Sequence, residues 1–267
     1  MISFTETSDA YHANPAIGST DARNLLTSPQ LFADALAGMA QRTTDALLFG
    51  IGTHCGLLEP ERFAREYAIK PKGMSFATTE GKAWRAAQGG RPIIDAADAQ
   101  HIQCMHARMP EEVREIFANC QKEVTVRTQI QGIEVQCRPD LWNFAGREFF
   151  DLKTIDSIGK IDRPIAARRY DVQIAWYRAV IEAETGAPVH SSPLIFVEKA
   201  PPYRWRIVEM DEDYLDLGKQ AVEEVLSQIS ARRKSGCWDD PGDVFHIARP
   251  PEWLLGDFRV TDEGIDL

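Results

Sequence analysis

Apolar residues recur at helical spacing through the first part of the chain. This spacing predicts short helices over residues 22–26 and 30–39, separated by Ser28-Pro29, after an irregular polar arm over residues 1–20. A third, apolar helix is predicted over residues 44–59, and its interior holds Gly50, Gly52 and Gly56. Each glycine in a helix interior costs about 0.5–1 kcal/mol, so three together indicate a close backbone approach or a ligand.

Two further segments continue the helical part of the chain. Residues 70–92 are rich in Gly, Lys and Thr and predict a loop around a short helix. Residues 95–119 predict a single amphipathic helix whose apolar stripe packs in the core: Ile102, Met105, Met109, Val113 and Ile116.

The pattern then changes from helical spacing to the alternation of strands. Residues 123–127, 133–138 and 147–153 predict three strands joined as a meander, with Gly132 and Gly146 at the turns. Further strands are expected at 193–199 and 203–209, and helices at 169–184 and 213–234. Because the 193–199 strand is apolar on both faces, we expect it to be central in the sheet.

This order of elements predicts an α/β protein with a mixed central sheet flanked by helices and a helical N-terminal extension. We expect one domain over residues 1–267. Residues 1–120 form its mostly helical part, residues 121–235 its sheet core, and residues 236–267 a proline-rich, acidic tail.

Composition and charge narrow the class of protein. The chain has 267 residues, 44% hydrophobic and 26% charged, which is typical of globular proteins. Its net charge of −10 argues against a broad cationic coat but allows a local basic groove. The five cysteines form no close pair, which argues against disulfides, a zinc site or an iron–sulfur cluster. No apolar run approaches a membrane span, so we expect a cytoplasmic protein with no membrane partner.

The residues that indicate chemistry lie between Arg138-Pro139-Asp140 and Asp151-Leu152-Lys153. Side chains two apart on a strand share a face, so Asp151 and Lys153 point the same way. If the second and third predicted strands form a hairpin, Asp140 lies beside Asp151. Two carboxylates and an ammonium group suit a Mg²⁺ site that promotes attack of water on a phosphate. The alternative is an ordinary ion-paired surface.

Other polar residues have both a functional and a structural interpretation. His54 is either a metal ligand or a structural histidine. Gln173 and Tyr177 lie four apart and share a helix face, which either turns to a substrate strand or forms a polar helix edge. Glu123 is either a further ligand or a charge at a strand edge.

A basic stretch directly follows the Asp151 strand. Over residues 158–170 it holds Lys160, Arg163, Arg168 and Arg169 against the single acid Asp162. These cations either contact phosphate groups or form a solvated loop. Acidic residues gather at 209–224 and 250–267, which we expect to face away from nucleic acid.

In this order the motifs resemble those of the PD-(D/E)XK nuclease superfamily. Four motifs carry the resemblance: Gly50-x-x-x-His54, Arg138-Pro139-Asp140, Asp151-Leu152-Lys153-Thr154 and Gln173-x-x-x-Tyr177. Shorter N-terminal motifs are similar to RecE-like (exodeoxyribonuclease VIII-type) phage exonucleases: Tyr11-His12-Ala13, Ser28-Pro29, Leu48-Phe49-Gly50 and Leu57-Leu58-Glu59-Pro60. The resemblance extends over roughly residues 10–235.

The resemblance implies a restriction-endonuclease-like fold and a role for each matching residue. His54, Asp140 and Asp151 would bind the metal, with the Leu152 carbonyl as a further ligand. Lys153 would be the catalytic lysine, and Gln173 and Tyr177 would lie at the site.

The resemblance also implies a reaction and its partners. RecE-like enzymes digest linear double-stranded DNA from 5′ ends to leave 3′ overhangs for recombination. They use Mg²⁺, for which Mn²⁺ can substitute, form a ring-shaped tetramer, and work beside a RecT-like single-strand annealing protein. The resemblance to phage enzymes also implies the cytoplasm of a bacterial host cell as the location. Two alternatives stay open: a structure-specific or internally cutting endonuclease of the same fold, and a non-catalytic DNA-binding or scaffold protein.

Overall fold

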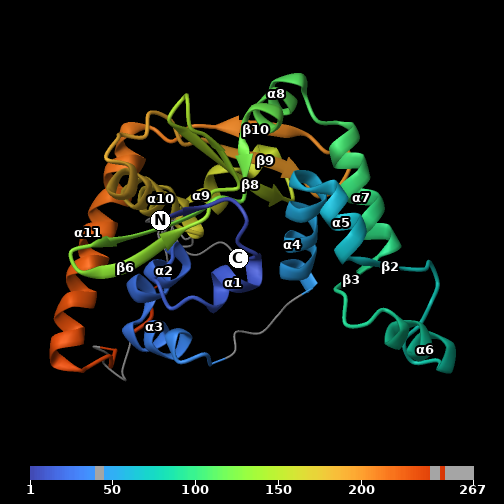
Figure 1. The fold of residues 1–267 in the computed structure, drawn as a ribbon, viewed down its shortest axis with the longest axis horizontal. Helices are drawn as coiled ribbons and strands as arrows, with labels where there is room; N and C mark the ends of the chain where they lie inside the picture. Colours follow the sequence, from blue (N-terminus) through green and yellow to red (C-terminus); the bar gives the residue numbers. More distant parts are fainter. Residues whose placement is uncertain (40–44, 241–246, 250–267) are drawn as a thin grey trace, which may run out of the picture.

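A five-stranded mixed sheet forms the centre of the molecule (Figure 1). The structure is a computed structural model that describes residues 1–39, 45–240 and 247–249. Strands β8 and β9 are parallel, and the other neighbours are antiparallel. The strand order is β10 (Trp205–Val208), β9 (Leu194–Glu198), β8 (Glu148–Ile155), β7 (Leu141–Asn143) and β4 (Gln121–Lys122).

Two smaller sheets accompany the central one. The antiparallel sheet has the order β1 (Ile2–Ser3), β5 (Thr125–Ile130) and β6 (Ile133–Cys137). A short parallel pair joins β2 (Ala68–Lys70) to β3 (Ile93–Asp95).

Helices cover both faces of the central sheet (Figure 1). In the first half of the chain they are α1 (Ser8–Ala13), α2 (Ser19–Thr27), α3 (Pro29–Leu36), α4 (Asp45–Leu58), α5 (Pro60–Glu66), α6 (Thr79–Ala87), α7 (Ala96–Ala107) and α8 (Glu111–Asn119). In the second half they are the 3-10 turn η1 (Ile158–Lys160), α9 (Asp162–Ala167), α10 (Tyr170–Thr185) and α11 (Glu212–Ser235).

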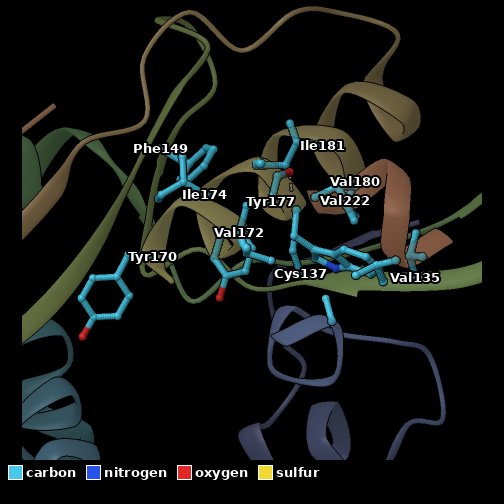
Figure 2. Packing of buried hydrophobic residues seen from close by; sticks show 14 of the residues in the cluster. Val135, Cys137, Phe149, Tyr170, Val172, Ile174, Tyr177, Val180, Ile181 and Val222 are labelled. Atoms are coloured by element: carbon cyan, nitrogen blue, oxygen red, sulfur yellow. Dashed lines mark hydrogen bonds between the residues drawn. The ribbon is translucent and has the colours of Figure 1, made fainter. Parts of the chain in front are cut away.

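Strand β8 separates two apolar cores because its side chains alternate between the two faces. Phe149 packs with residues of α10, α11, α2 and the β5–β6 pair. Figure 2 shows Phe149 beside Ile174 and Tyr177 of α10. Phe150 and Leu152 pack on the opposite face with residues of α4, α7 and α8. The sheet is therefore buried on both faces, as predicted for a mixed sheet flanked by helices.

Several predicted helices are confirmed, but the predictions for residues 95–119 and for residues 1–20 are wrong. The 95–119 helix is split into α7 and α8, because Pro110 cannot continue a helix and becomes the N-cap of α8. The apolar stripe still packs in the core as predicted, since Ile102, Met105, Met109 and Val113 are buried. The first 20 residues are not an irregular arm, because they contain β1, α1 and the start of α2.

The first pairing of the predicted meander is confirmed, because β5 and β6 form an antiparallel hairpin around Gly132, but its second pairing is wrong. Strand β6 pairs with β5 in the smaller sheet and not with β8. The partner of β8 on that side is β7, a three-residue strand that the sequence pattern did not predict. The 193–199 strand is confirmed as β9, which is buried along its whole length between β8 and β10.

Helix α4 packs closely where two of its glycines lie. A Cβ atom on Gly52 would lie 2.2 Å from Ile94 Cδ1, and one on Gly56 would lie 2.7 Å from Ile102 Cγ2. The predicted close approach is confirmed at these two positions, whereas nothing lies within 4 Å at Gly50. The helix is not buried throughout, because Leu48 and Ile51 are exposed.

No helix within the described ranges is long and apolar enough to cross a membrane. The predicted acidic segment 250–267 lies outside the described residues.

Candidate active site

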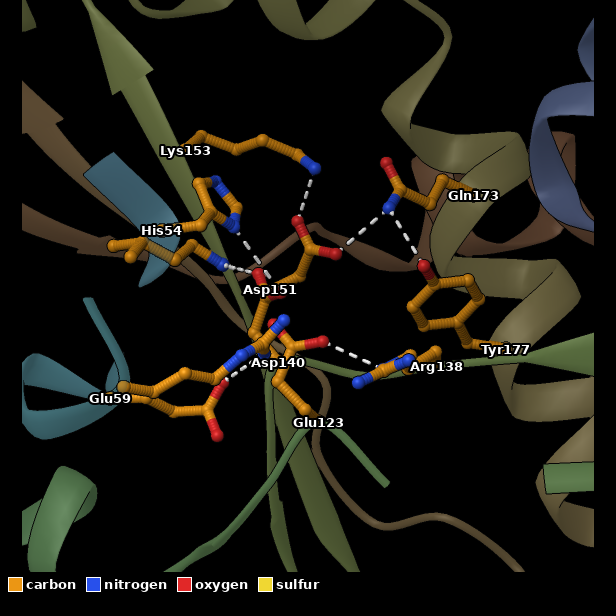
Figure 3. A network of polar contacts seen from close by, with 11 residues as sticks. His54, Glu59, Glu123, Arg138, Asp140, Asp151, Lys153, Gln173 and Tyr177 are labelled. Atoms are coloured by element: carbon orange, nitrogen blue, oxygen red, sulfur yellow. Dashed lines mark hydrogen bonds and ion pairs between the residues drawn. The ribbon is translucent and has the colours of Figure 1, made fainter. Parts of the chain in front are cut away.

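Asp151 and Lys153 lie on the same face of β8, as their spacing predicts (Figure 3). The Asp151 side chain is only 2% exposed, and its Oδ2 forms an ion pair with Lys153 Nζ. Leu152, between them, is fully buried in the opposite core. An Asp–Lys pair on a solvent-exposed edge would contribute little, but this pair is removed from water, so its charges act at short range.

Asp140 reaches Asp151 through β7 and not through the predicted hairpin. Strand β6 ends at Cys137, and the chain passes through Pro139 into β7, where Leu141 lies opposite Phe150. This register brings Asp140 next to Asp151, and its Oδ2 accepts a 2.6 Å hydrogen bond from the backbone N–H of Leu152. The predicted proximity is therefore confirmed, with a different strand providing it.

His54 enters the site from α4. Its Nδ1 lies 3.3 Å from Asp140 Oδ1. Burial acts to lower the pKa of His54, but the charge of Asp140 and its hydrogen bond raise that pKa above its ordinary value. Burial likewise acts to raise the pKa of Asp140, but His54, and after it Lys153 and the Leu152 N–H, outweigh burial, so this carboxyl's pKa falls below its ordinary value.

The environment of Asp151 acts in the opposite direction. Burial, and then the neighbouring charge of Asp140, raise the pKa of Asp151 above its ordinary value although Lys153 opposes this. Two buried carboxylates side by side are stabilised by a cation between them, because each disfavours the other's charge.

Helix α10 supplies Gln173 and Tyr177, which lie one turn apart on the face toward β8 (Figure 3). Gln173 Nε2 donates a 2.8 Å hydrogen bond to Asp151 Oδ1 and a 3.2 Å one to the Tyr177 hydroxyl. Both side chains are buried. Their predicted placement at the site is thus what the structure shows, and Gln173 holds one oxygen of Asp151 in place.

A second ion pair lies beside Asp140. Glu123 Oε2 is 2.7 Å from Arg138 Nε, and the Arg138 guanidinium lies 5.7 Å from the centre of the Tyr11 ring. Burial and the charge of Asp140 raise the pKa of Glu123 to about 7. Glu123 does not open β5 as expected, since it occupies a left-handed turn (φ 55°) before that strand.

The donor set suits a hard divalent cation. Carboxylate oxygens are the preferred ligands of Mg²⁺, and an imidazole nitrogen is tolerated by Mn²⁺. In the conformation seen, no three His, Cys, Asp or Glu side chains of the described part of the chain form a ready-made ligand cluster. Asp140, Asp151 and His54 nevertheless lie near one another beside β8, the middle strand of the sheet, where the charges of two adjacent buried carboxylates favour a bound cation.

The predicted DNA-contacting residues divide into two groups. Lys160, Arg163 and Arg168 line a cavity at the end of β8. Arg169 does not line it, because its guanidinium is bound by Asp171 through Nε and Nη2, the latter at 2.8 Å. Its predicted DNA contact, like the predicted metal contact of the Leu152 carbonyl, stays a prediction.

Two residues near the site escaped the sequence analysis. Lys199, after β9, lines the same cavity, and Tyr170 lies between that cavity and Lys153, whose Nζ is 4.9 Å from the ring centre. The only sequence signal for Tyr170 was its position at the start of the helix that carries Gln173.

A buried Asp–Asp–Lys set on a mixed sheet, supported by a glutamine from the following helix, defines a nuclease of the PD-(D/E)XK superfamily. The chain belongs to the family described as PDDEXK-like domain of unknown function (DUF3799), which matches residues 18–243. The predicted superfamily and its restriction-endonuclease-like fold are thereby confirmed.

Solved structures of similar fold include a candidate exonuclease from Eubacterium rectale. It shares 16% identity with a TM-score of 0.64, over 96% of this chain and 99% of that one. An alkaline exonuclease from Laribacter hongkongensis matches more weakly, at 15% identity and a TM-score of 0.31, over 66% of this chain and 98% of its own. No curated protein sequence matches the chain. The first of these similarities supports the fold alone.

Proposed function

We propose that the protein is a Mg²⁺-dependent exodeoxyribonuclease that digests linear double-stranded DNA from 5′ ends and leaves 3′ overhangs for recombination. The observation that carries the hydrolytic part is the meeting of Asp140, Asp151 and Lys153 in one buried patch. The direction of digestion rests on the RecE-like motifs of the N-terminal segment.

In this proposal Asp140, Asp151 and His54 hold the metal, and the Leu152 carbonyl adds a ligand. A divalent cation there would draw charge from the scissile phosphate and lower the pKa of the attacking water. Lys153 places a positive charge beside Asp151, where it stabilises the negative charge that develops on the phosphate. Gln173 keeps Asp151 in position through its 2.8 Å hydrogen bond.

The surroundings of the site supply the DNA contacts and, by resemblance, the partners. In this proposal Lys160, Arg163 and Arg168, which are exposed and follow β8, bind phosphates next to the reacting strand. A ring-shaped homotetramer and a RecT-like annealing protein complete the proposal by analogy with RecE-like enzymes.

Digestion of end-labelled linear duplex DNA tests this proposal. We expect wild-type protein with Mg²⁺ to release a 5′ label early, to leave closed circular DNA intact, and to stop in EDTA. Lys153→Met removes the ammonium group but keeps an aliphatic chain, and we expect it to abolish digestion. Lys234→Met, an exposed lysine near the end of α11, is the matched control and should digest as wild type does.

Each other outcome selects an alternative. Cleavage of the closed circle would favour an endonuclease of the same fold, and early release of a 3′ label would reverse the proposed direction. Absence of metal-dependent cleavage of any DNA would leave a binding or scaffold protein.

A further inference from the structure

Helix α6 lies at the end of a projection from the molecule, apart from the central sheet and from the other helices (Figure 1). We call residues 68–95 the arm: the chain leaves the body through β2, forms α6, and returns through β3. Ile94, at the base of the arm, packs in the core on the Leu152 side of the sheet. Helix α6 itself adds no residue to either core among the described residues. Packing of the fold therefore does not account for it.

The arm has a defined structure of its own. The rings of Phe76 and Trp84 stack, with their centres 6.3 Å apart. Gly81 lies so close to the preceding turn that a Cβ atom there would clash with the backbone oxygen of Ser75. Thr78 caps α6, because its hydroxyl accepts a 3.1 Å hydrogen bond from the Gly81 N–H. The other side chains of α6 therefore project from a fixed frame and not from a loose loop.

The arm is strongly basic on a protein whose net charge is −10. Residues 70–92 hold five cations and a single acid, Glu80. Three of these cations are exposed and have no hydrogen-bond or ion-pair partner among the described residues: Lys72, Lys82 and Arg85. Lys82 and Arg85 lie three apart in α6, so they share one face of the helix. Such a group of exposed cations attracts a polyanion.

The base of the arm is fixed to the helix that carries His54. Ile94 of β3 packs against Gly52 of α4, where there is no room for a Cβ atom. His54 follows two residues later in α4, and its Nδ1 lies 3.3 Å from Asp140 Oδ1 in the active site. A partner bound by the arm is thereby held in a fixed orientation relative to the active site.

The chemistry of the arm fits the backbone of a nucleic-acid duplex. The core of a protein interface is rich in aromatic side chains and poor in lysine, and single strands stack their bases on exposed aromatic rings. Here Phe76 and Trp84 are half-buried and stack on each other, and the Arg85 guanidinium lies 5.3 Å from the centre of the Phe76 ring. The rings thus serve the packing of the arm, and the exposed cations are left to contact phosphates irrespective of base sequence.

We propose that the arm is a second contact for double-stranded DNA, in which Lys72, Lys82 and Arg85 bind backbone phosphates of the duplex away from the nucleotides at the active site. This contact makes the protein select long duplexes over duplexes too short to extend from the active site to the arm. The proposal rests on the proposed nuclease function for the identity of the polyanion, and it uses none of the cations that follow β8.

Fluorescence anisotropy with a labelled 40-bp duplex in EDTA tests this contact without hydrolysis. We expect the triple variant Lys72→Gln, Lys82→Gln, Arg85→Gln, the arm variant, to bind the duplex at least 10-fold more weakly than wild-type protein. The slope of log K against log[KCl] should become shallower by about 2–3, because each lost phosphate contact removes about 0.9 from it. A single strand of 40 nucleotides should lose less affinity than the duplex does.

The matched control removes the same charge from the opposite side of the molecule (Figure 1). It is the triple variant Lys219→Gln, Arg233→Gln, Lys234→Gln, whose three cations are exposed on α11, and it should bind the duplex as wild type does. Equal weakening by the two triple variants would reduce the effect to net charge and overturn the proposal. Wild-type affinity in the arm variant, or an equal loss for single strand and duplex, would also overturn it.

Digestion with Mg²⁺ tests the selection for length. We expect the arm variant to raise KM for a 40-bp duplex at least 10-fold with kcat unchanged, and to leave KM for a 12-bp duplex unchanged. An equal rise for both lengths would place the three cations beside the reacting strand and overturn a separate contact.

Other outcomes separate this proposal from its neighbours. If wild-type protein digests DNA and the arm variant binds the duplex as wild type does, the nuclease proposal stands and the arm proposal fails. If the arm variant loses duplex affinity as expected but no protein digests DNA, the arm proposal stands and the nuclease proposal fails. A changed sedimentation coefficient of the arm variant, with duplex affinity unchanged, would assign the arm to contact between copies of the chain and overturn the proposal.

Discussion

Asp151 on β8 and Glu198 on the neighbouring parallel strand β9 are equally buried, each 2% exposed, yet their surroundings differ. Glu198 accepts hydrogen bonds from the backbone N–H groups of Ile158 and Arg204, at 3.0 and 3.2 Å, and pairs with the Arg204 guanidinium. These donors lower the pKa of Glu198 to about 2. Asp151 accepts from Gln173, pairs with Lys153, and lies beside a second carboxylate, Asp140.

The difference teaches how a structural carboxylate differs from a reactive one. Around Glu198, fixed donors within the fold satisfy the charge, so it ties η1 and the β9–β10 turn together. Around Asp151 and Asp140, the fold supplies less positive charge than two carboxylates need. A bound metal ion and the substrate can supply the missing positive charge and hydrogen bonds. Without them, the unbalanced charge of the two carboxylates lowers the stability of the folded protein, as is common at functional sites.

The largest effect should follow from Asp151→Asn. We expect digestion to slow by about 10³-fold, because loss of one carboxylate from the metal set forfeits several kcal/mol of transition-state stabilisation. The free energy of unfolding should change little, since the variant also removes a buried charge next to Asp140. Steady-state rates on linear DNA and urea unfolding measure the two quantities. Marked unfolding of Asp151→Asn would show that Asp151 is structural in the way that Glu198 is.

Metal binding should show the next largest effect. At a Mg²⁺ concentration about 100 times the Kd, the wild-type protein should gain about 2.7 kcal/mol of stability, because the ion binds only the folded chain. Thermal unfolding at constant ionic strength measures the gain. We expect Glu198→Gln to keep this gain and Asp151→Asn to lose it. An equal gain in both variants would place the metal elsewhere.

Glu198→Gln should lower the free energy of unfolding by about 1–2 kcal/mol, because the charge-assisted hydrogen bonds to Arg204 become weaker. We expect it to stay active, since glutamine can still accept from the Ile158 N–H. Urea unfolding of both proteins measures the loss. An inactive but fully stable Glu198→Gln protein would mean that Glu198 takes part in the reaction and is not a structural carboxylate.

The contribution of Glu198 should depend on pH. Its pKa in the folded protein is about 2, below the ordinary 4.5, so the unfolded chain binds this proton more readily. The stabilisation is therefore complete above pH 4.5 and is lost as the pH falls toward 2. The difference in unfolding free energy between wild type and Glu198→Gln should shrink between pH 7 and pH 3. A constant difference over this interval would mean that the ion pair does not stabilise the fold.

Much of this site was predictable because it depends on local geometry. Alternation along one strand places Asp151 and Lys153 on one face, and helical spacing places Gln173 and Tyr177 together. The position of Asp140 beside Asp151 was predicted for the wrong reason. A three-residue strand such as β7 is too short to show periodicity. The sequence pattern therefore predicted β6, and not β7, as the neighbour of β8.

Long-range pairing was the part that the sequence could not reveal. Strands β5 and β6 alternate like the strands of the central sheet, and nothing local shows that they form a separate sheet with β1. The helical breaks were similarly obscured, since the apolar stripe runs on through Pro110 and the core uses residues on both sides of it. Lys199, which follows β9, lines the cavity although it is far in sequence from the other cations there, so no sequence motif predicts its position.

The smallest effect should come from Tyr177→Phe. The tyrosine hydroxyl accepts one hydrogen of the Gln173 amide at 3.2 Å, while the other bonds to Asp151 at 2.8 Å. Loss of one such bond is worth about 0.5–1.4 kcal/mol, or a 2- to 10-fold decrease in kcat, with KM for DNA unchanged. Steady-state kinetics measure both constants, and Gln173→Leu, which removes both bonds, should be slower still. A decrease in Tyr177→Phe of 100-fold or more, or a raised KM, would mean that the hydroxyl contacts the DNA itself. Gln173 would then hold Asp151 without help from Tyr177. Asp151 would have even fewer fixed hydrogen-bond donors around it, relative to Glu198, than the structure shows.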